Sequence, residues 1–172
     1  MSGKAEPDTI CVAADGLELE TAIAPGALTL RADLAAVIAS AIAAANQATG
    51  PTRGEVTVIV DDDARIQLLN RQWRGFDKPT NVLSFPAPDH QPGEAPYLGD
   101  IAISYETAAR EAADEGKSFG AHVAHLAVHG FLHLMGFDHE SDGDAAEMEG
   151  LERDILAQIG ISDPYIAPAA DG

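Results

Sequence analysis

The sequence predicts a single domain of mixed α and β structure. Its 172 residues are enough to bury a hydrophobic core without disulfide bonds, which a chain with one cysteine, Cys11, cannot form internally. Short segments rich in β-branched residues alternate with longer segments of helical apolar spacing, as expected where strands and helices share one core. We expect the domain to span residues 1–172, with residues 1–8 and 167–172 as loose tails.

The first third of the chain predicts strands on either side of one long helix. Strands are expected at Thr9–Ala13 and Leu17–Ile23, which are short and rich in apolar and β-branched residues. Leu30–Ala48 is expected to be a helix, because alanine is abundant there and larger apolar residues recur every three or four positions. After a Gly-Pro-Thr turn, Glu55–Val60 is the clearest strand.

Three consecutive aspartates, residues 61–63, follow that strand. We expect them to cap a helix that extends to about Trp73, since a carboxylate at a helix N-terminus accepts hydrogen bonds from free N–H groups and favours the helix dipole. A metal site built from the three acids is the alternative, and capping is the preferred interpretation.

The remaining elements are two strands and three helices. A loop over residues 74–81 precedes the strand Val82–Phe85, and a Pro- and Gly-rich exposed loop over residues 86–96 precedes the strand Gly99–Ser104. Helices are then expected at Tyr105–Glu115, Phe119–Met135 and Asp144–Ile159.

Composition and charge exclude several classes of protein. No apolar segment is long enough to span a membrane and no hydrophobic signal core follows the N-terminus, so a cytoplasmic location is the default expectation. The net charge of −18 argues at first against a nucleic-acid partner, because phosphates repel an acidic surface. However, four of the ten basic residues fall in one short stretch: Arg65, Arg71, Arg74 and Lys78. They form either a local basic patch or, more simply, ordinary solvated side chains.

The most informative segment is the run His-Gly-Phe-Leu-His-Leu-Met-Gly-Phe-Asp-His from His129 to His139. His129 and His133 are four residues apart, so on a helix they project from one face. Gly136 suits a helix end where the chain reverses, which would return His139 toward the other two imidazoles. Three converging imidazoles are good ligands for zinc, and another divalent transition metal remains possible.

The same spacing occurs in the long zinc-protease signature, but one residue differs. The glutamate that follows the first histidine of that signature, and acts as the general base, is replaced here by Gly130. No fourth protein ligand is evident, and three histidines with an open position favour hydrolysis over a closed structural site.

Four further polar residues surround the predicted ligands. His122 and His125 lie on the same helix face, and we expect hydrogen-bonding or supporting roles for them rather than direct ligation. Asp138 and Glu140 either hold ligand imidazoles in place or face water.

The run from His129 to His139 resembles the signature of the YbeY-type endoribonucleases, which are metal-dependent rRNA maturation factors of bacteria. Further segments resemble the family's other blocks in the same order, and the match runs from about Val56 to Ile166. These segments are Leu69-Asn70, Trp73-Arg74-Gly75, Asp77–Pro86, Leu98–Ile101, Ala121-His122, Ala124-His125 and Asp163–Ile166.

The resemblance implies an α+β fold, a small mixed sheet packed with about five helices, with the metal site at the rim of a cleft. It also implies a catalytic role for Arg74, whose guanidinium suits phosphate oxygens; from the residues alone, a surface or salt-bridged arginine is equally possible. Lys78 is a candidate phosphate contact, and Asn81 and Ser84 either line the cleft or cap backbone groups. Asp100 supports the site or ends a strand.

The expected function is that of a single-strand-specific, metal-dependent endoribonuclease in small-subunit rRNA 3′-end maturation and ribosome quality control, with one zinc ion. Its expected partners are single-stranded rRNA precursors and the ribosome or ribosomal proteins, and not DNA or membranes. Two alternatives remain open: a metallopeptidase-like hydrolase, and a non-catalytic ribosome-assembly factor with a structural metal.

Overall fold

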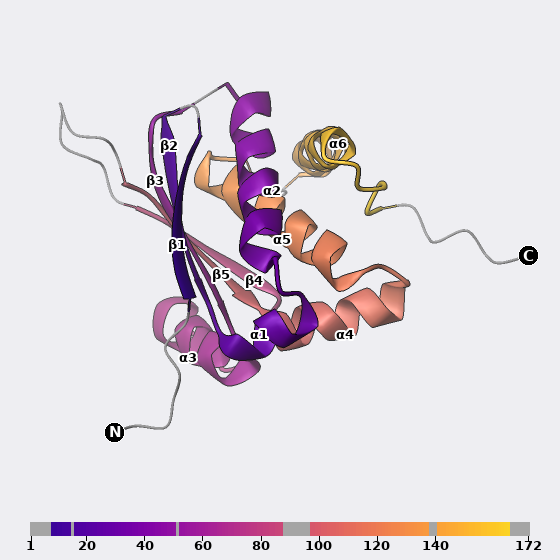
Figure 1. Ribbon diagram of the computed structural model, residues 1–172. Coiled ribbons are helices and arrows are strands. Elements are labelled where there is room, and N and C mark those ends of the chain that lie inside the picture. Colours follow the sequence, from indigo (N-terminus) through magenta and orange to yellow (C-terminus); the bar gives the residue numbers. More distant parts are fainter. Residues whose placement is uncertain (1–7, 15, 51, 88–96, 138–140, 166–172) are drawn as a thin grey trace, which may run out of the picture.

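The computed structural model describes residues 8–14, 16–50, 52–87, 97–137 and 141–165, and these form a five-stranded sheet with six helices (Figure 1). The strands are β1 (Asp8–Ala14), β2 (Leu17–Ile23), β3 (Gly54–Asp61), β4 (Val82–Pro86) and β5 (Tyr97–Ser104). The helices are α1 (Pro25–Leu30), α2 (Leu34–Ala48), α3 (Asp63–Arg74), α4 (Tyr105–Glu115), α5 (Phe119–Leu134) and α6 (Asp142–Gln158).

The sheet is mixed and its strand order is β1-β2-β3-β5-β4. Strands β2, β3 and β5 run parallel, while β1 and β4 pair antiparallel at the two ends. The expected α+β architecture with a small mixed sheet is therefore confirmed. The edge strand β4 is contacted by α5 and by Ile66 of α3.

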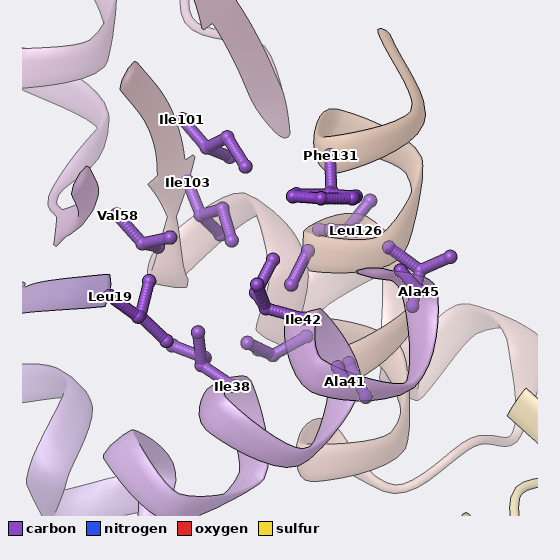
Figure 2. Packing of buried hydrophobic residues seen from close by; sticks show 14 of the residues in the cluster. Leu19, Ile38, Ala41, Ile42, Ala45, Val58, Ile101, Ile103, Leu126 and Phe131 are labelled. Atoms are coloured by element: carbon purple, nitrogen blue, oxygen red, sulfur yellow. The ribbon is translucent and has the colours of Figure 1, made fainter. Parts of the chain in front are cut away.

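One face of the sheet carries the main core. Helices α2 and α5 pack on this face, and α6 contacts both of them on the side away from the sheet (Figure 1). Figure 2 shows Ile42 of α2 and Phe131 of α5 directed toward Val58, Ile101 and Ile103 of the sheet, and all five side chains are buried. Burial of these side chains is the main source of stability and fixes α5 against the sheet.

On the opposite face, α3 packs against β4 and β5. Ile66 of α3 packs against Leu83 of β4 and Ala102 of β5 in a second, smaller apolar cluster. Asp62 caps the helix by accepting a hydrogen bond from the Arg65 N–H at 2.9 Å, and the left-handed Gly75 ends it.

Of the three aspartates, Asp62 caps the helix as expected, whereas Asp61 ends β3 and accepts a hydrogen bond from the Asp62 N–H at 2.8 Å. Beside the cap formed by Asp62, the Asp63 carboxylate accepts hydrogen bonds from Ser104, Thr107 and Arg110, which ties α3 to the start of α4. The acids are thus satisfied by protein donors.

The helix expected at Leu30–Ala48 begins later, at Leu34, and the short α1 before it was not predicted, which explains why six helices are seen where about five were expected. Pro25 occupies the first turn of the short α1, and Arg31 then adopts an extended conformation before α2 begins. The Arg31 side chain donates to Asp33 Oδ1 at 2.5 Å, and its guanidinium lies so close to Gly120 of α5 that a Cβ at Gly120 would lie 2.6 Å from Arg31 Nη1. At the N-terminus, Asp8 already belongs to β1, so the predicted tail is shorter by that residue.

Among the described residues, no helix combines the length and the apolar character required to cross a bilayer.

Candidate metal centre and cleft

Helix α5 presents the histidines. Its N-terminus is capped by Ser118, whose hydroxyl accepts a hydrogen bond from the Ala121 N–H at 3.1 Å, and it ends at Leu134. Gly136 has a φ of 96°, and the Gly136 N–H donates to the His133 carbonyl. The predicted glycine turn is therefore present at the end of the helix.

His129 and His133 converge as the spacing predicts. Their Nε2 atoms are 3.1 Å apart and their ring centroids 4.6 Å apart. Two imidazoles bound tetrahedrally to one zinc ion at about 2.0–2.1 Å would hold their nitrogens about 3.3 Å apart. The pair is thus spaced to share a cation.

Sequence reasoning missed the residue behind this pair, Glu152 of α6. Its side chain is fully buried, and its Oε1 lies 2.9 Å from His125 Nε2 and 3.0 Å from His129 Nδ1. The Tyr165 hydroxyl donates to Oε2 at 2.7 Å. Burial alone would raise the pKa of Glu152, but the hydrogen bonds from His125, His129 and Tyr165 outweigh it and lower the pKa to about 2.

The ionised Glu152 carboxylate selects which ring nitrogen of each histidine donates a hydrogen bond to it. An ionised carboxylate only accepts hydrogen bonds, so His129 must carry its hydrogen on Nδ1. The lone pair of His129 Nε2 is then directed toward His133, as a metal ligand requires. His125 donates its Nε2–H to the same carboxylate, which suits a supporting role.

A cleft of about 330 Å³ opens in front of the pair. It brings together several of the residues that the sequence singled out, since Arg74, Asn81 and Ser84 line it with His129 and His133. The residues come from α3, from β4 with the segment before it, and from α5.

Arg74 is anchored on the edge strand. Its Nη2 donates to the Ser84 carbonyl at 2.6 Å, and its guanidinium carbon lies 5.7 Å from the centroid of the Phe85 ring. Among the described residues Arg74 forms no ion pair with a carboxylate. Guanidinium has five N–H donors, so most of them are left for an anion in the cleft.

Asn81 both lines the cleft and caps the backbone. Its Oδ1 accepts from the Val82 N–H at 2.7 Å, and its Nδ2 donates to Glu111 Oε1 at 3.0 Å. The same Glu111 oxygen lies 2.9 Å from Nε2 of the buried His122. His122 therefore contacts Glu111 rather than the metal pair, and this contact joins α5 to α4.

Ser84 and Gly130 form a tight contact between α5 and β4. Ser84 is 7% exposed, and its Oγ donates to the Gly130 carbonyl at 3.0 Å. A Cβ at Gly130 would lie 2.7 Å from Ile101 Cγ2 and 3.2 Å from Ser84 Oγ. Position 130 faces the sheet and has no room for the glutamate of the zinc-protease signature.

Two candidates lie away from the cleft. Lys78 is exposed, and its Nζ is 5.8 Å from the Phe76 ring centroid, outside the cleft lining. Asp100 of β5 accepts a hydrogen bond from the Tyr97 hydroxyl on the α3 face of the sheet. Burial, followed by this hydrogen bond, raises the pKa of Tyr97 to about 12.

His139 and Asp138 lie outside the described residues, as does Glu140. Within the described ranges, no three or more His, Cys, Asp or Glu residues gather into a metal-binding group. His129 and His133 are therefore the described part of the predicted centre, and their convergent nitrogens fit a zinc-type ion.

A signal for Glu152 was present in the sequence. It follows Met148 by four residues and precedes Ile155 and Leu156 by three and four, so it occupies the buried stripe of the last helix. A carboxylate at such a position needs a partner, which is an indication of function. Tyr165 lies in the segment Asp163–Ile166, which resembles a segment of the family, but the sequence indicates no role for its side chain.

Comparison with known proteins shows the family of the chain. The family model described as "Endoribonuclease YbeY" matches residues 27–160. A protein of that name from Nitrobacter winogradskyi is 57% identical over 139 residues, covering 76% of this chain and 70% of the relative. One from Rhodopseudomonas palustris (strain BisB18) is 56% identical over 140 residues, covering 78% of this chain and 83% of the relative.

A solution structure of a Thermotoga maritima protein is similar in fold. The two superpose with a TM-score of 0.51 over 87% of this chain and 99% of the other, at 24% identity. The extent of the family match and the high identity to the curated relatives lead to one conclusion: the chain belongs to the YbeY endoribonuclease family.

Proposed function

We propose that this protein is a metal-dependent endoribonuclease that cleaves single-stranded rRNA precursors during maturation of the small-subunit 3′ end and ribosome quality control. The observation that carries the proposal is the meeting of His129, His133 and Arg74 in one cleft. Ligands for a cation and a guanidinium in the same cleft are the two elements that stabilise a phosphoryl group under attack.

The proposed cofactor is one zinc ion held by His129, His133 and His139, and another divalent transition metal would fit the same donors. Held by these residues, such an ion would supply Lewis-acid polarisation of the phosphate and activation of water. Glu152 holds His129 in the ligating tautomer through the 3.0 Å contact with Nδ1. His125 and Asp138 are proposed as supporting residues.

Arg74 is the proposed catalytic residue. Anchored by the Ser84 carbonyl, it places its remaining donors toward the phosphate oxygens and stabilises the charge that develops on them. Asn81 is held by Glu111 and is proposed, with Ser84 and the more distant Lys78, to bind substrate. The cleft admits an RNA backbone whose bases are splayed apart, which favours single strands over duplexes.

The proposed setting is the cytoplasm, with the ribosome or ribosomal proteins as partners and the whole chain, residues 1–172, as one domain. The net charge of −18 makes positively charged ribosomal proteins suitable partners.

The test is cleavage of a precursor rRNA 3′-end fragment by purified protein, with Arg74→Ala and His133→Ala compared with wild type. Arg71→Ala is the matched control, since Arg71 is an exposed arginine of α3 that does not line the cleft. Cleavage should be lost in the first two variants and with chelator, and retained in the control. Equal cleavage by all proteins would identify a contaminating nuclease and refute the proposal.

A non-catalytic assembly factor would behave differently. In that case His133→Ala lowers the melting temperature, whereas folded Arg74→Ala supports full cellular function.

A further inference from the structure

A second cavity, of about 510 Å³, lies on the face of the sheet opposite α5. We call it the α3 groove. It is bounded by the C-terminal end of α3 and by strands β4 and β5, and its lining includes Trp73, Phe85, Tyr97 and Asp100. None of these residues has a role in the metal centre.

The groove is aromatic and open. Trp73 is 71% exposed and Tyr97 is 39% exposed. The ring centroids of Trp73 and Phe85 are 6.5 Å apart, with the planes tilted by 59°. Exposure of so large an apolar side chain gains nothing for folding, so a tryptophan placed at the mouth of a cavity indicates a ligand with an apolar face.

The groove adjoins the metal cleft at the edge strand. Arg74, Ser84 and Pro86 line both cavities, one on each side of the edge strand β4. The Arg74 guanidinium lies over the Phe85 ring and also reaches the Ser84 carbonyl, so one cationic group faces both spaces. A chain that crosses the β4 edge therefore meets Arg74 first and the aromatic surface next.

We propose that the α3 groove binds a nucleobase of the single-stranded RNA, stacked on Trp73, next to the phosphate that lies at Arg74. The inference rests on the proposed function, which places that phosphate in the cleft. Single-stranded nucleic acids are bound in this way elsewhere, by cationic groups along the backbone and aromatic side chains under the bases. Stacking on Trp73 is tolerant of sequence, because every base has a π face.

The test uses Trp73 itself as the probe, because it is the only tryptophan of the chain. Full-length protein with its metal is mixed with a single-stranded oligoadenylate in a stopped-flow fluorimeter, so that binding is recorded before turnover. The tryptophan emission should be quenched saturably. An abasic oligomer of the same length and charge should cause little quenching and bind about tenfold more weakly, the loss typical of one stacked base.

Variants separate stacking from folding. Trp73→Ala should raise the KM for oligoadenylate cleavage about tenfold with little change in kcat, and Trp73→Phe should restore most of the loss. Phe76→Ala is the matched control, since Phe76 is an exposed aromatic residue three positions away that does not line the groove. It should leave KM unchanged, and all variants should keep the wild-type melting temperature.

The outcomes distinguish the two proposals. Quenching that persists in His133→Ala, which no longer cleaves, supports the groove independently of catalysis. Quenching by wild type without any cleavage would support the groove while refuting the nuclease. The groove proposal would be overturned, and the nuclease proposal left intact, by two results together. The wild type would cleave normally without any quenching of its emission, and Trp73→Ala would have an unchanged KM.

Discussion

Replacing Glu152 by glutamine is predicted to weaken metal binding while preserving the fold. The amide oxygen can accept the same hydrogen bonds from His125 and His129, and the amide nitrogen can donate to the Tyr165 oxygen in place of the present bond. What disappears is the buried negative charge that accepts the charge-assisted hydrogen bond from His129 Nδ1. Loss of such a partner behind a ligand typically weakens metal binding about 10–100-fold, or roughly 1.4–2.7 kcal/mol.

Glu152→Ala provides the contrast. Alanine leaves the imidazole donors of His125 and His129 without their acceptor in a buried site, at a cost of about 1–3 kcal/mol for each. The combined loss of about 2–6 kcal/mol is a large share of the stability of an ordinary domain, so the melting temperature should fall clearly.

The assay is competition for Zn²⁺ between the protein and a chromophoric chelator at neutral pH, together with thermal unfolding. Glu147→Gln is the matched control, because Glu147 is an exposed residue of the same helix. Wild-type zinc affinity in a folded Glu152→Gln protein would refute the argument that the carboxylate tunes His129.

Three other results are expected. Gly130→Ala should lower the free energy of unfolding in urea by about 1–3 kcal/mol, because its Cβ would meet Ile101 Cγ2 at 2.7 Å. Gly143→Ala, whose Cβ would have no contact under 3.9 Å, should not lower it. Equal stability of the two variants would contradict the packing described at Gly130. Burial would raise the pKa of Asp63, but hydrogen bonds from Ser104, Thr107 and Arg110 outweigh it and lower the pKa below the ordinary value of 3.8. The contribution of Asp63 to stability is therefore present above that value and is lost as the pH falls through the lowered pKa. Urea titrations between about pH 2 and 5 should show a smaller loss of stability with falling pH in Asp63→Asn than in the wild type. An unchanged loss would count against this role of Asp63. Arg74→Lys should lose about 10²-fold in kcat, since an ammonium cannot keep the Ser84 contact and fork onto phosphate; wild-type activity would show that charge alone suffices.

The local pattern of the sequence predicts most of the elements, because their cause is local. Alternation predicts β2 with its observed bounds, Leu17–Ile23, and helical spacing with a serine before it predicts the start of α5 at Phe119. The short α1 was not predictable in this way, because its six residues show too little of a helical apolar period. Likewise, β4 lies outside β5 in the sheet although it precedes it in sequence.

The same distinction applies to the site. The His129 and His133 pair follows from the period of one helix. Glu152 was missed because its contact with His129 spans 23 residues and two helices, and only its anomalous place on an apolar stripe pointed to it. The α3 groove could not be predicted, since Trp73, Phe85 and Tyr97 meet only after the sheet is assembled.

The most direct test of the central claim, a cation held by imidazoles at the cleft, is the metal content of protein purified without added ions. We expect about one zinc ion per chain in the wild type, with loss of that ion in His133→Ala and His139→Ala and retention in the exposed-residue control Glu147→Gln. A wild-type protein that neither contains nor takes up a divalent metal, or variants that keep a full equivalent, would contradict the account.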